Sequence, residues 1–418
     1  MPVGKTEGEP EGRPAKKQKT AAKAPSTLSN IIKLTVSRDQ AHVVAVTEDK
    51  CVRVFSINSD GTLVELSQRI MPKRPCAIEV LPDLENIIIG DKFGDVYSLP
   101  LIAVDPPEKP ATAGAEKETP APAFKPSATT LTVHSQRNLR ALESQQKQKL
   151  FAPKKEALAF EHKLLLGHVS MLTDTTFATR EVDGRQRGYI ITADRDEHVR
   201  ISRGPPQAHI IEGYCLGHKD FVSNVCLIPG TDLLVSGGGD DWLGIWDWPN
   251  FTLKAKLDLQ FALVGFLSAT DDKVAVSGLW AVPVDNRPGE FALCVACEKA
   301  SALILYPSWA LATGQAAPTI FSTESSNVLD VSHQDHRLVV SVDARNDGQA
   351  RLLGYRIQLS EDNTITTTRD ADFEKQLSQA NSLTGVEEDP KTLDNLLYST
   401  AQLRKRGGWD EQQPADEA

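Results

Sequence analysis

The sequence contains the residue types that serine hydrolases combine in their catalytic triads. In such enzymes a histidine, an acid and a hydroxyl residue supply the general base, the group that orients it and the nucleophile. Two sets occur here with the same order of types: His168, Thr192 and Asp196, and later His218, Ser236 and Asp240. A catalytic set need not be duplicated, whereas a structural set recurs with each repeat. We therefore predict that both sets are structural.

Two further motifs suggest chemistry at first sight. The glycine run 237–239 ahead of Asp240 resembles a phosphate loop, but no helix or GK[ST] follows, so it is read as a turn between strands. Cys294 and Cys297 form a CxxC, but a zinc site would need a second pair or histidines at ligand spacing. No Rossmann glycine pattern follows a strand. The sequence predicts no metal site, no cofactor site and no catalytic residue.

The two histidine sets belong to a repeat. Gly-His at 167–168 recurs at 217–218, and the later copy closes with Trp246-Asp247. A Gly-His followed by a Trp-Asp dipeptide is typical of a blade in a WD-repeat β-propeller.

The repeat predicts a buried polar network. We expect His218 to bridge Asp240 and the Ser236 hydroxyl, with Trp246 packed beside them and its N–H available. Each polar group then has a partner, which is the condition for burying it without penalty. In the earlier copy Ser202 stands where the tryptophan would be, so that network is expected to be incomplete.

Short apolar runs of period two, separated by turn residues, continue along most of the chain and indicate an all-β protein. We count six blades, spread over residues 28–102 and 159–368. Since one blade cannot bury its own faces, we expect the blades to pack against one another in a ring. Three segments are expected outside the propeller: a disordered basic N-terminus (1–27), a disordered Pro-rich insertion (103–158) and a partly disordered tail (369–418).

The composition excludes several classes of protein. The chain has 418 residues with 46 Lys plus Arg and 56 Asp plus Glu, a formal charge of −10, which argues against coating nucleic acid by bulk charge but leaves room for a local basic patch. No apolar run is long enough to cross a membrane, and the N-terminus lacks a signal-peptide core. The basic run within residues 13–23 fits a nuclear import signal or a nucleic-acid arm, or else a solvated linker.

Several segments are more specific than a generic blade. They are LLGHVSMLTDTTF, ITADRDEHVRIS, CLGHKDFVS, SGGGDDWLGIWDW, and KRPCAIEVLP followed by IIIGDKFGDVYSLPL. Together they closely resemble the WD-repeat, non-catalytic subunit of the eukaryotic tRNA guanine-N7 methyltransferase in its fungal form. LLYSTAQLRKRG near the C-terminus is a further match.

The resemblance implies a scaffold that pairs one-to-one with a catalytic subunit, which would bind S-adenosylmethionine. The pair would form N7-methylguanine in the variable loop of certain tRNAs, in the nucleus or cytoplasm. The resemblance also implies seven blades, with one ahead of the Lys-rich segment where none is readable here. Either the ring is one blade short and open, or the sequence lacks a first segment. The alternative function is a generic WD-repeat adaptor, such as a ubiquitin-ligase substrate receptor or a chromatin scaffold.

Residues of the third blade are candidates for the partner contact. Alternation in HVRIS puts Val199 and Ile201 on one face and Arg200 on the other, where an arginine must reach the rim or meet an acid. The resemblance places Arg200 at the contact with the catalytic subunit, opposite a carboxylate. The alternative is an ion pair within the chain, with one of three acids: Asp194, Glu197 or Asp220.

Other charged residues are candidates for the same surface. Those nearest Arg200 in the repeat are Arg195, Glu197, Arg203 and Lys219. Lys73, Arg74 and Lys92 could form a basic rim that faces tRNA phosphates or the partner, or they could belong to solvated loops. Arg404, Lys405 and Arg406 form a second basic cluster in the tail.

Overall fold

The computed structural model describes residues 29–103, 160–266, 273–315, 317–323, 326–334, 337–345, 349–381 and 389–405. Its strands form six four-stranded sheets, each built from four strands that are consecutive in the sequence. Neighbouring strands within a sheet run antiparallel. The predicted N-terminal segment and the Pro-rich insertion lie outside the described residues.

The first three sheets contain β1 (Ile31–Val36), β2 (His42–Thr47), β3 (Cys51–Ile57), β4 (Leu63–Ile70), β5 (Pro75–Val80), β6 (Asn86–Asp91), β7 (Asp95–Pro100), β8 (Lys163–Gly167), β9 (Leu172–Val182), β10 (Arg185–Asp194), β11 (Val199–Arg203) and β12 (Ile211–Cys215). The other three contain β13 (Val222–Leu227), β14 (Leu233–Gly238), β15 (Trp242–Asp247), β16 (Thr252–Asp258), β17 (Val276–Pro283), β18 (Phe291–Cys297), β19 (Ala302–Pro307), β20 (Thr319–Ser322), β21 (Val328–Gln334), β22 (Arg337–Val342), β23 (Leu352–Leu359) and β24 (Ile365–Arg369). Short 3-10 helices follow β15 and β19, namely η1 (Trp248–Asn250) and η2 (Ser308–Thr313).

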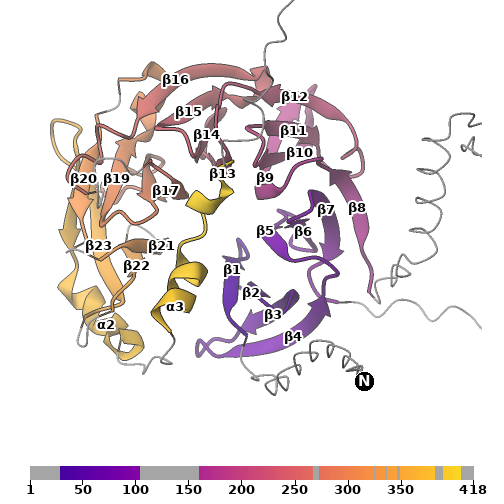
Figure 1. The fold of residues 1–418 in the computed structure, drawn as a ribbon, viewed down its shortest axis with the longest axis horizontal. Helices are drawn as coiled ribbons and strands as arrows, with labels where there is room; N and C mark the ends of the chain where they lie inside the picture. Colours follow the sequence, from indigo (N-terminus) through magenta and orange to yellow (C-terminus); the bar gives the residue numbers. More distant parts are fainter. Residues whose placement is uncertain are drawn as a thin grey trace, which may run out of the picture.

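The six sheets stand around a common centre like the blades of a propeller (Figure 1). The first strand of each blade is the innermost, and these strands pack in series, from β1 on β5 to β17 on β21. The structure is therefore a six-bladed β-propeller, which confirms the all-β fold and the six blades read from the sequence.

The ring is not closed by packing of the last blade on the first. Among the described residues β21 and β1 do not pack to the extent that the other neighbouring first strands do. No seventh sheet is present in the described part of the chain, so the seven blades implied by the resemblance are not found there. As a consequence β1 and β4 leave apolar side chains exposed, among them Ile31, Leu34 and Leu63.

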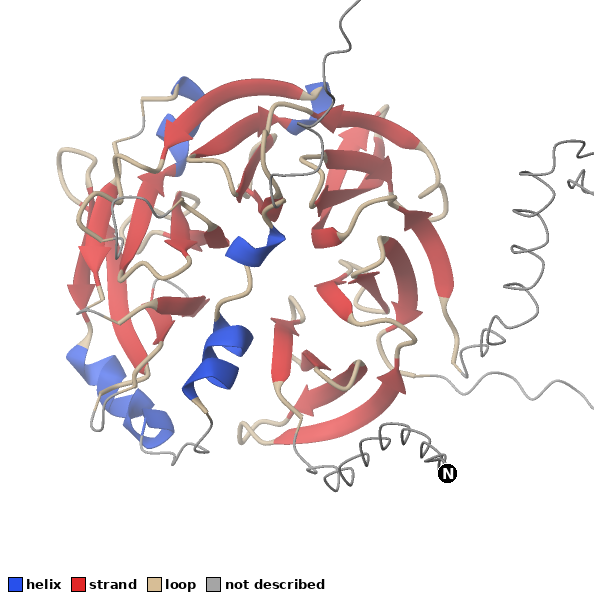
Figure 2. Cartoon of the chain, viewed as in Figure 1, coloured by secondary structure: helices blue, strands red, loops and turns tan. Residues whose placement is uncertain are grey.

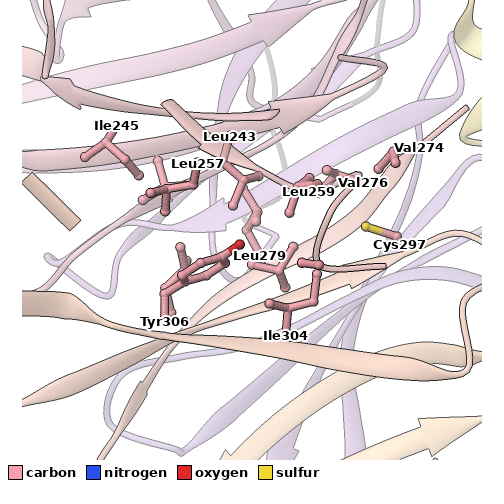
Figure 3. Packing of buried hydrophobic residues seen from close by; sticks show 14 of the residues in the cluster. Leu243, Ile245, Leu257, Leu259, Val274, Val276, Leu279, Cys297, Ile304 and Tyr306 are labelled. Atoms are coloured by element: carbon pink, nitrogen blue, oxygen red, sulfur yellow. The ribbon is translucent and has the colours of Figure 1, made fainter. Parts of the chain in front are cut away.

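The hydrophobic core lies between neighbouring blades. Ile245 of β15 and Leu257 of β16 face Leu279 of β17 and Ile304 and Tyr306 of β19 in one buried cluster (Figure 3). Successive strand residues point to opposite faces, so each blade offers an apolar face to each neighbour. This requirement explains why the apolar runs recur along the whole chain.

Two helices follow the last strand. α2 (Ala371–Asn381) packs on β23, where Phe373 lies so close to Gly354 that a Cβ there would approach its ring to 3.0 Å. α3 (Pro390–Leu397) is capped by Asp389, whose side chain accepts the Thr392 N–H. Residues 398–405, including η3 (Ala401–Leu403), then cross the middle of the ring (Figure 2). We call residues 398–405 the C-terminal strap. None of the described helices is long and apolar enough to span a membrane.

A cavity of about 750 Å³ opens among the inner strands, and Glu79 of β5 lines it with Arg38, Cys226 and Trp280. Burial raises the pKa of Glu79 to about 7 from its ordinary value of 4.5. The negative charge of Asp174 raises this pKa further, and the positive charge of Arg38 lowers it. The ionised carboxylate is therefore disfavoured in the folded protein.

We expect Glu79→Gln to increase the free energy of unfolding by about 1–3 kcal/mol at about pH 8 and to change it little at about pH 4. The pKa is higher in the folded state, so the cost of Glu79 appears as the pH rises above 4.5 and is complete above about 7. Denaturant titrations at both pH values measure this difference. An equal gain at both would mean that the substitution acts through packing and not through charge.

Candidate partner-binding site

The predicted polar network of the fourth blade is present. His218 Nδ1 lies 2.8 Å from Asp240 Oδ2, and His218 Nε2 lies 2.6 Å from the Ser236 hydroxyl. Trp246 Nε1 donates to the same hydroxyl at 2.7 Å. Ser236 and Trp246 are completely buried, so this serine is not accessible to a substrate. The set is structural.

Asp240, the acid of this network, is stabilised in its ionised form. Burial by itself would raise the pKa of Asp240, but the hydrogen bond from His218 and the backbone N–H groups of Lys219 and Asp220 bring it below its ordinary value. The His218 ring also stacks on Trp242, with ring centroids 4.5 Å apart and nearly parallel planes. These contacts fix the ring that joins Asp240 to Ser236.

In the third blade, the prediction that Asp196 completes the set is wrong, because Asp194 takes that place. His168 Nε2 lies 2.8 Å from the Thr192 hydroxyl, and His168 Nδ1 lies 3.2 Å from Asp194 Oδ2. β10 ends at Asp194, the second residue after Thr192, and the side chain of this last strand residue bonds to His168. In the fourth blade three glycines separate the hydroxyl residue from its turn acid. Asp196 lies at the tip of the turn, where it forms an ion pair with Lys405 at 3.2 Å.

A hollow of about 380 Å³ lies beside the third-blade network, between the loop after β8, the turn after β10 and strand β12. Val169 and Leu216 at its edge are 108% and 61% exposed, and Tyr214 is 39% exposed. Apolar and aromatic side chains that face solvent around a polar centre are typical of protein–protein contact sites.

Arg200 lines this hollow although its side chain is buried. Its Nη1 donates to the Gly167 carbonyl oxygen at 2.9 Å, and its Nε donates to the Ser202 hydroxyl at 3.0 Å. Burial lowers the pKa of the Arg200 guanidinium, and Tyr214 opposes this effect only in part. Both hydrogen-bond partners are neutral, which makes the site attractive to a carboxylate.

The internal ion pairs considered for Arg200 are not formed, because each of the three acids is bonded elsewhere. Asp194 bonds to His168 at 3.2 Å, Glu197 bonds to Lys405 at 3.2 Å, and Asp220 bonds to Arg404. Among the described residues no acid lies within ion-pair distance of the Arg200 side chain. The charge is thus available to a group from another molecule.

The other predicted contact residues have different surroundings in the structure. Arg195 Nε donates to the Leu403 carbonyl oxygen at 2.6 Å, so Arg195, like Glu197, is engaged by the strap. Arg203 forms an ion pair with Glu212 across β11 and β12. Lys219 is exposed, and its backbone N–H bonds to the Asp240 carboxylate.

The predicted basic rim is also divided. The Lys73 ammonium lies 3.5 Å above the exposed Phe93 ring. Arg74 lies 3.7 Å from Glu48, and together with Lys92 it lines a cavity beneath the strap. Of the three, only Lys73 is absent from the lining of this cavity.

The strap is the element beside the site that sequence reasoning missed. The Tyr398 hydroxyl donates to Asp343 at 2.5 Å, and Glu298 accepts the N–H groups of Thr400 and Ala401 at 2.8 and 2.7 Å. Arg404 bonds to Asp220 and to the carbonyl oxygens of Gly239 and Val274. The strap thus ties the sixth, fifth, fourth and third blades together. The LLYSTAQLRKRG match and its basic cluster were the available signal, but they do not reveal which turn acids they meet.

We expect Arg404→Ala to release the strap, because three hydrogen bonds are lost and Asp220 keeps an uncompensated charge. The amides of residues 398–405 should exchange with solvent roughly 30–100 times faster, equivalent to about 2–3 kcal/mol of local opening. Hydrogen exchange followed by mass spectrometry measures this. Lys405→Ala is the matched control, since its ion pairs are exposed and worth less than about 1 kcal/mol. Equal exchange in the two variants would contradict the role given to Arg404.

Comparison with known proteins assigns the chain to a family. The family described as the tRNA methyltransferase TRM82 WD40 domain matches residues 3–356. The chain is 45% identical over 352 residues to the tRNA (guanine-N(7)-)-methyltransferase non-catalytic subunit TRM82 of Coccidioides immitis, an alignment that covers 79% of the chain and 65% of the relative. The chain therefore spans just under two thirds of that relative. It is 41% identical over 417 residues to the protein of the same name in Phaeosphaeria nodorum, with 91% and 84% covered, and 39% identical over 435 residues to that of Aspergillus clavatus, with 96% and 83% covered.

Proposed function

The chain belongs to the tRNA methyltransferase TRM82 WD40 family, and on that basis we propose that it is the non-catalytic subunit of a tRNA (guanine-N7)-methyltransferase. It performs no chemistry itself, which agrees with the burial of both histidine sets inside the propeller. The observation that carries the proposal beyond family membership is the Arg200 hollow, where a buried cation that pairs with no acid of the described residues lies among exposed apolar side chains.

The hollow is the proposed docking site for the catalytic subunit, as a heterodimer. A carboxylate of the partner would meet the Arg200 guanidinium, while its apolar side chains would cover Val169, Tyr214 and Leu216. Desolvated charge pairs surrounded by apolar contacts are the kind of contact that dominates binding energies. The strap stabilises the turn next to this site, because the Leu403 carbonyl oxygen accepts a hydrogen bond from Arg195.

The scaffold raises activity by favouring the folded, active form of its partner. Binding only that form stabilises it by about 2.7 kcal/mol at a hundredfold excess over Kd. We place S-adenosylmethionine on the catalytic subunit, since the described strands of this chain pair antiparallel and supply no strand–helix–strand unit for a nucleotide-like cofactor.

We place tRNA contacts at the same end of the ring. The loops that lead from one blade to the next lie at one end of a propeller, and they carry both the hollow and the free cations Lys73 and Lys219. Phosphates of a tRNA held by the catalytic subunit would come within reach of these side chains. We also place the complex in the nucleus, on the basic N-terminal run, which lies outside the described residues.

Purification of the tagged chain from its own cells tests the proposal. We expect a class of methyltransferase that acts on RNA, together with tRNA, to accompany it in stoichiometric amounts. Recovery of ubiquitin-ligase or chromatin components in their place would favour a generic adaptor and contradict the proposal.

A further inference from the structure

The cavity beneath the C-terminal strap, at the centre of the ring, has no role in the proposed function. Its volume is about 340 Å³, and the first strands of five blades form its walls, with Ser399 to Leu403 of the strap above. Three cationic side chains, Lys33, Arg74 and Lys92, belong to its lining, and no acid does. This composition differs from that of the Arg200 hollow, whose lining includes acids.

The cations of this cavity are poorly neutralised. Among the described residues neither Lys33 nor Lys92 has a carboxylate within ion-pair distance, and Arg74 has only Glu48, at 3.7 Å. Asp174 and Asp330 attract Lys33 at longer range. Three positive charges that enclose one space repel one another, so an anion between them is favoured.

Two donors in the walls have no partner. Among the described residues, the buried Nε of Arg74 and the buried Oγ of Ser277 have no hydrogen-bond partner. Ser277 lies at a bulge of β17, which leaves it outside the regular pairing with β18. Buried donors without partners are rare in native proteins and indicate a bound ion, ligand or water.

We propose that this cavity binds a small phosphate-bearing molecule, either free phosphate or pyrophosphate or a phosphate monoester. Lys33, Arg74 and Lys92 neutralise the phosphate oxygens, and Ser277 donates to them from the opposite wall. The volume is ample for a phosphate, given about 30 Å³ for a water molecule, and residues of the strap lie over the space. A neighbouring cavity beside α3 also has Arg74 and Lys92 in its lining.

The ligand would also complete the ring. The strap is bonded to the third, fourth, fifth and sixth blades, whereas Lys33 belongs to the first blade and Lys92 to the second. An anion held between these lysines and the strap joins the two ends of the open propeller. This inference does not depend on the proposed function, because it uses no contact with a methyltransferase.

Calorimetric and thermal-melt titrations of the full chain with pyrophosphate, inorganic phosphate and a nucleoside monophosphate test the proposal. Sodium sulfate at matched ionic strength is the reference for unspecific anion effects. We expect saturable binding with a rise in Tm for at least one phosphate, and slower hydrogen exchange in residues 398–405. The compound that binds most tightly distinguishes free phosphate from a phosphate monoester.

Variants separate the cavity from the general surface. Lys92→Gln changes an exposed side chain, so it should fold, and we expect its phosphate Kd to rise about tenfold; Lys33→Gln and Ser277→Ala should weaken binding further or comparably. Lys163→Gln, an exposed lysine of β8 away from the cavity, should bind as the unchanged chain does. The proposal is overturned if sulfate shifts Tm as much as the phosphates do, if the cavity variants bind with unchanged Kd, or if only tRNA binds.

Discussion

Replacing Trp246 with alanine should lower the free energy of unfolding by about 3–5 kcal/mol, the usual cost of deleting a large buried aromatic side chain. The Trp246 ring is completely buried and belongs to the cluster that joins the third and fourth blades. Its N–H also satisfies Ser236, so the loss combines a cavity with a weakened polar network. Gly244 lies against the ring, since a Cβ there would come within 2.6 Å of Nε1, and it cannot fill the space that alanine leaves.

Trp246→Phe is the matched control, because it keeps most of the packing and removes only the N–H. We expect it to cost about 1–2 kcal/mol. Guanidinium unfolding of the two variants beside the unchanged chain measures both values. Losses of equal size would show that the hydrogen bond, and not the packing between blades, is the main contribution of this tryptophan.

Replacing Arg200 with alanine should weaken binding of the catalytic subunit by about 2–5 kcal/mol, which is roughly 30-fold to several-thousand-fold in Kd. The side chain is buried, is held by Gly167 and Ser202, and has no acid of its own chain to neutralise it. A partner carboxylate that meets it would be left desolvated and unpaired in the variant. Surface-plasmon or calorimetric titration with the purified catalytic subunit measures this loss.

Two controls make the Arg200 result specific. Arg200→Lys keeps the charge but lacks the planar fork, so we expect an intermediate loss. Arg180→Ala removes an exposed arginine of the same blade that pairs with Asp232 at 3.4 Å, and it should leave the affinity unchanged. Equal affinities for Arg200→Ala and Arg180→Ala would remove the hollow from the interface.

The repeat could be predicted from the sequence because its parts are local. Period-two apolar runs predict strands, and the Gly-His and Trp-Asp pairs predict which side chains meet in the fourth blade. The same spacing argument failed at Asp196, because the acid that bonds to the histidine stands two residues after the hydroxyl residue in the third blade and four residues after it in the fourth. Alignment of the copies by residue count assumes that the acid occupies the same position in both turns, which is not so in these two blades.

The environment of Arg200 could not be predicted for a different reason. Whether it meets an internal acid depends on where three other acids go, and two of them are bonded by the strap, from the far end of the chain. Contacts between the tail and four blades are set by the three-dimensional arrangement of the blades, which no local pattern encodes. Charged residues near a predicted site are thus easy to find from sequence, but their pairing is not.

The most direct test of the central claim is the N7-methylguanine content of tRNA in cells that lack this gene. We predict that the modified base is lost on deletion, returns with the unchanged gene, and does not return with Arg200→Ala expressed at the same level. An unchanged N7-methylguanine content of tRNA in the deleted strain, or full recovery with Arg200→Ala, would contradict a scaffold that binds its catalytic subunit through the third blade.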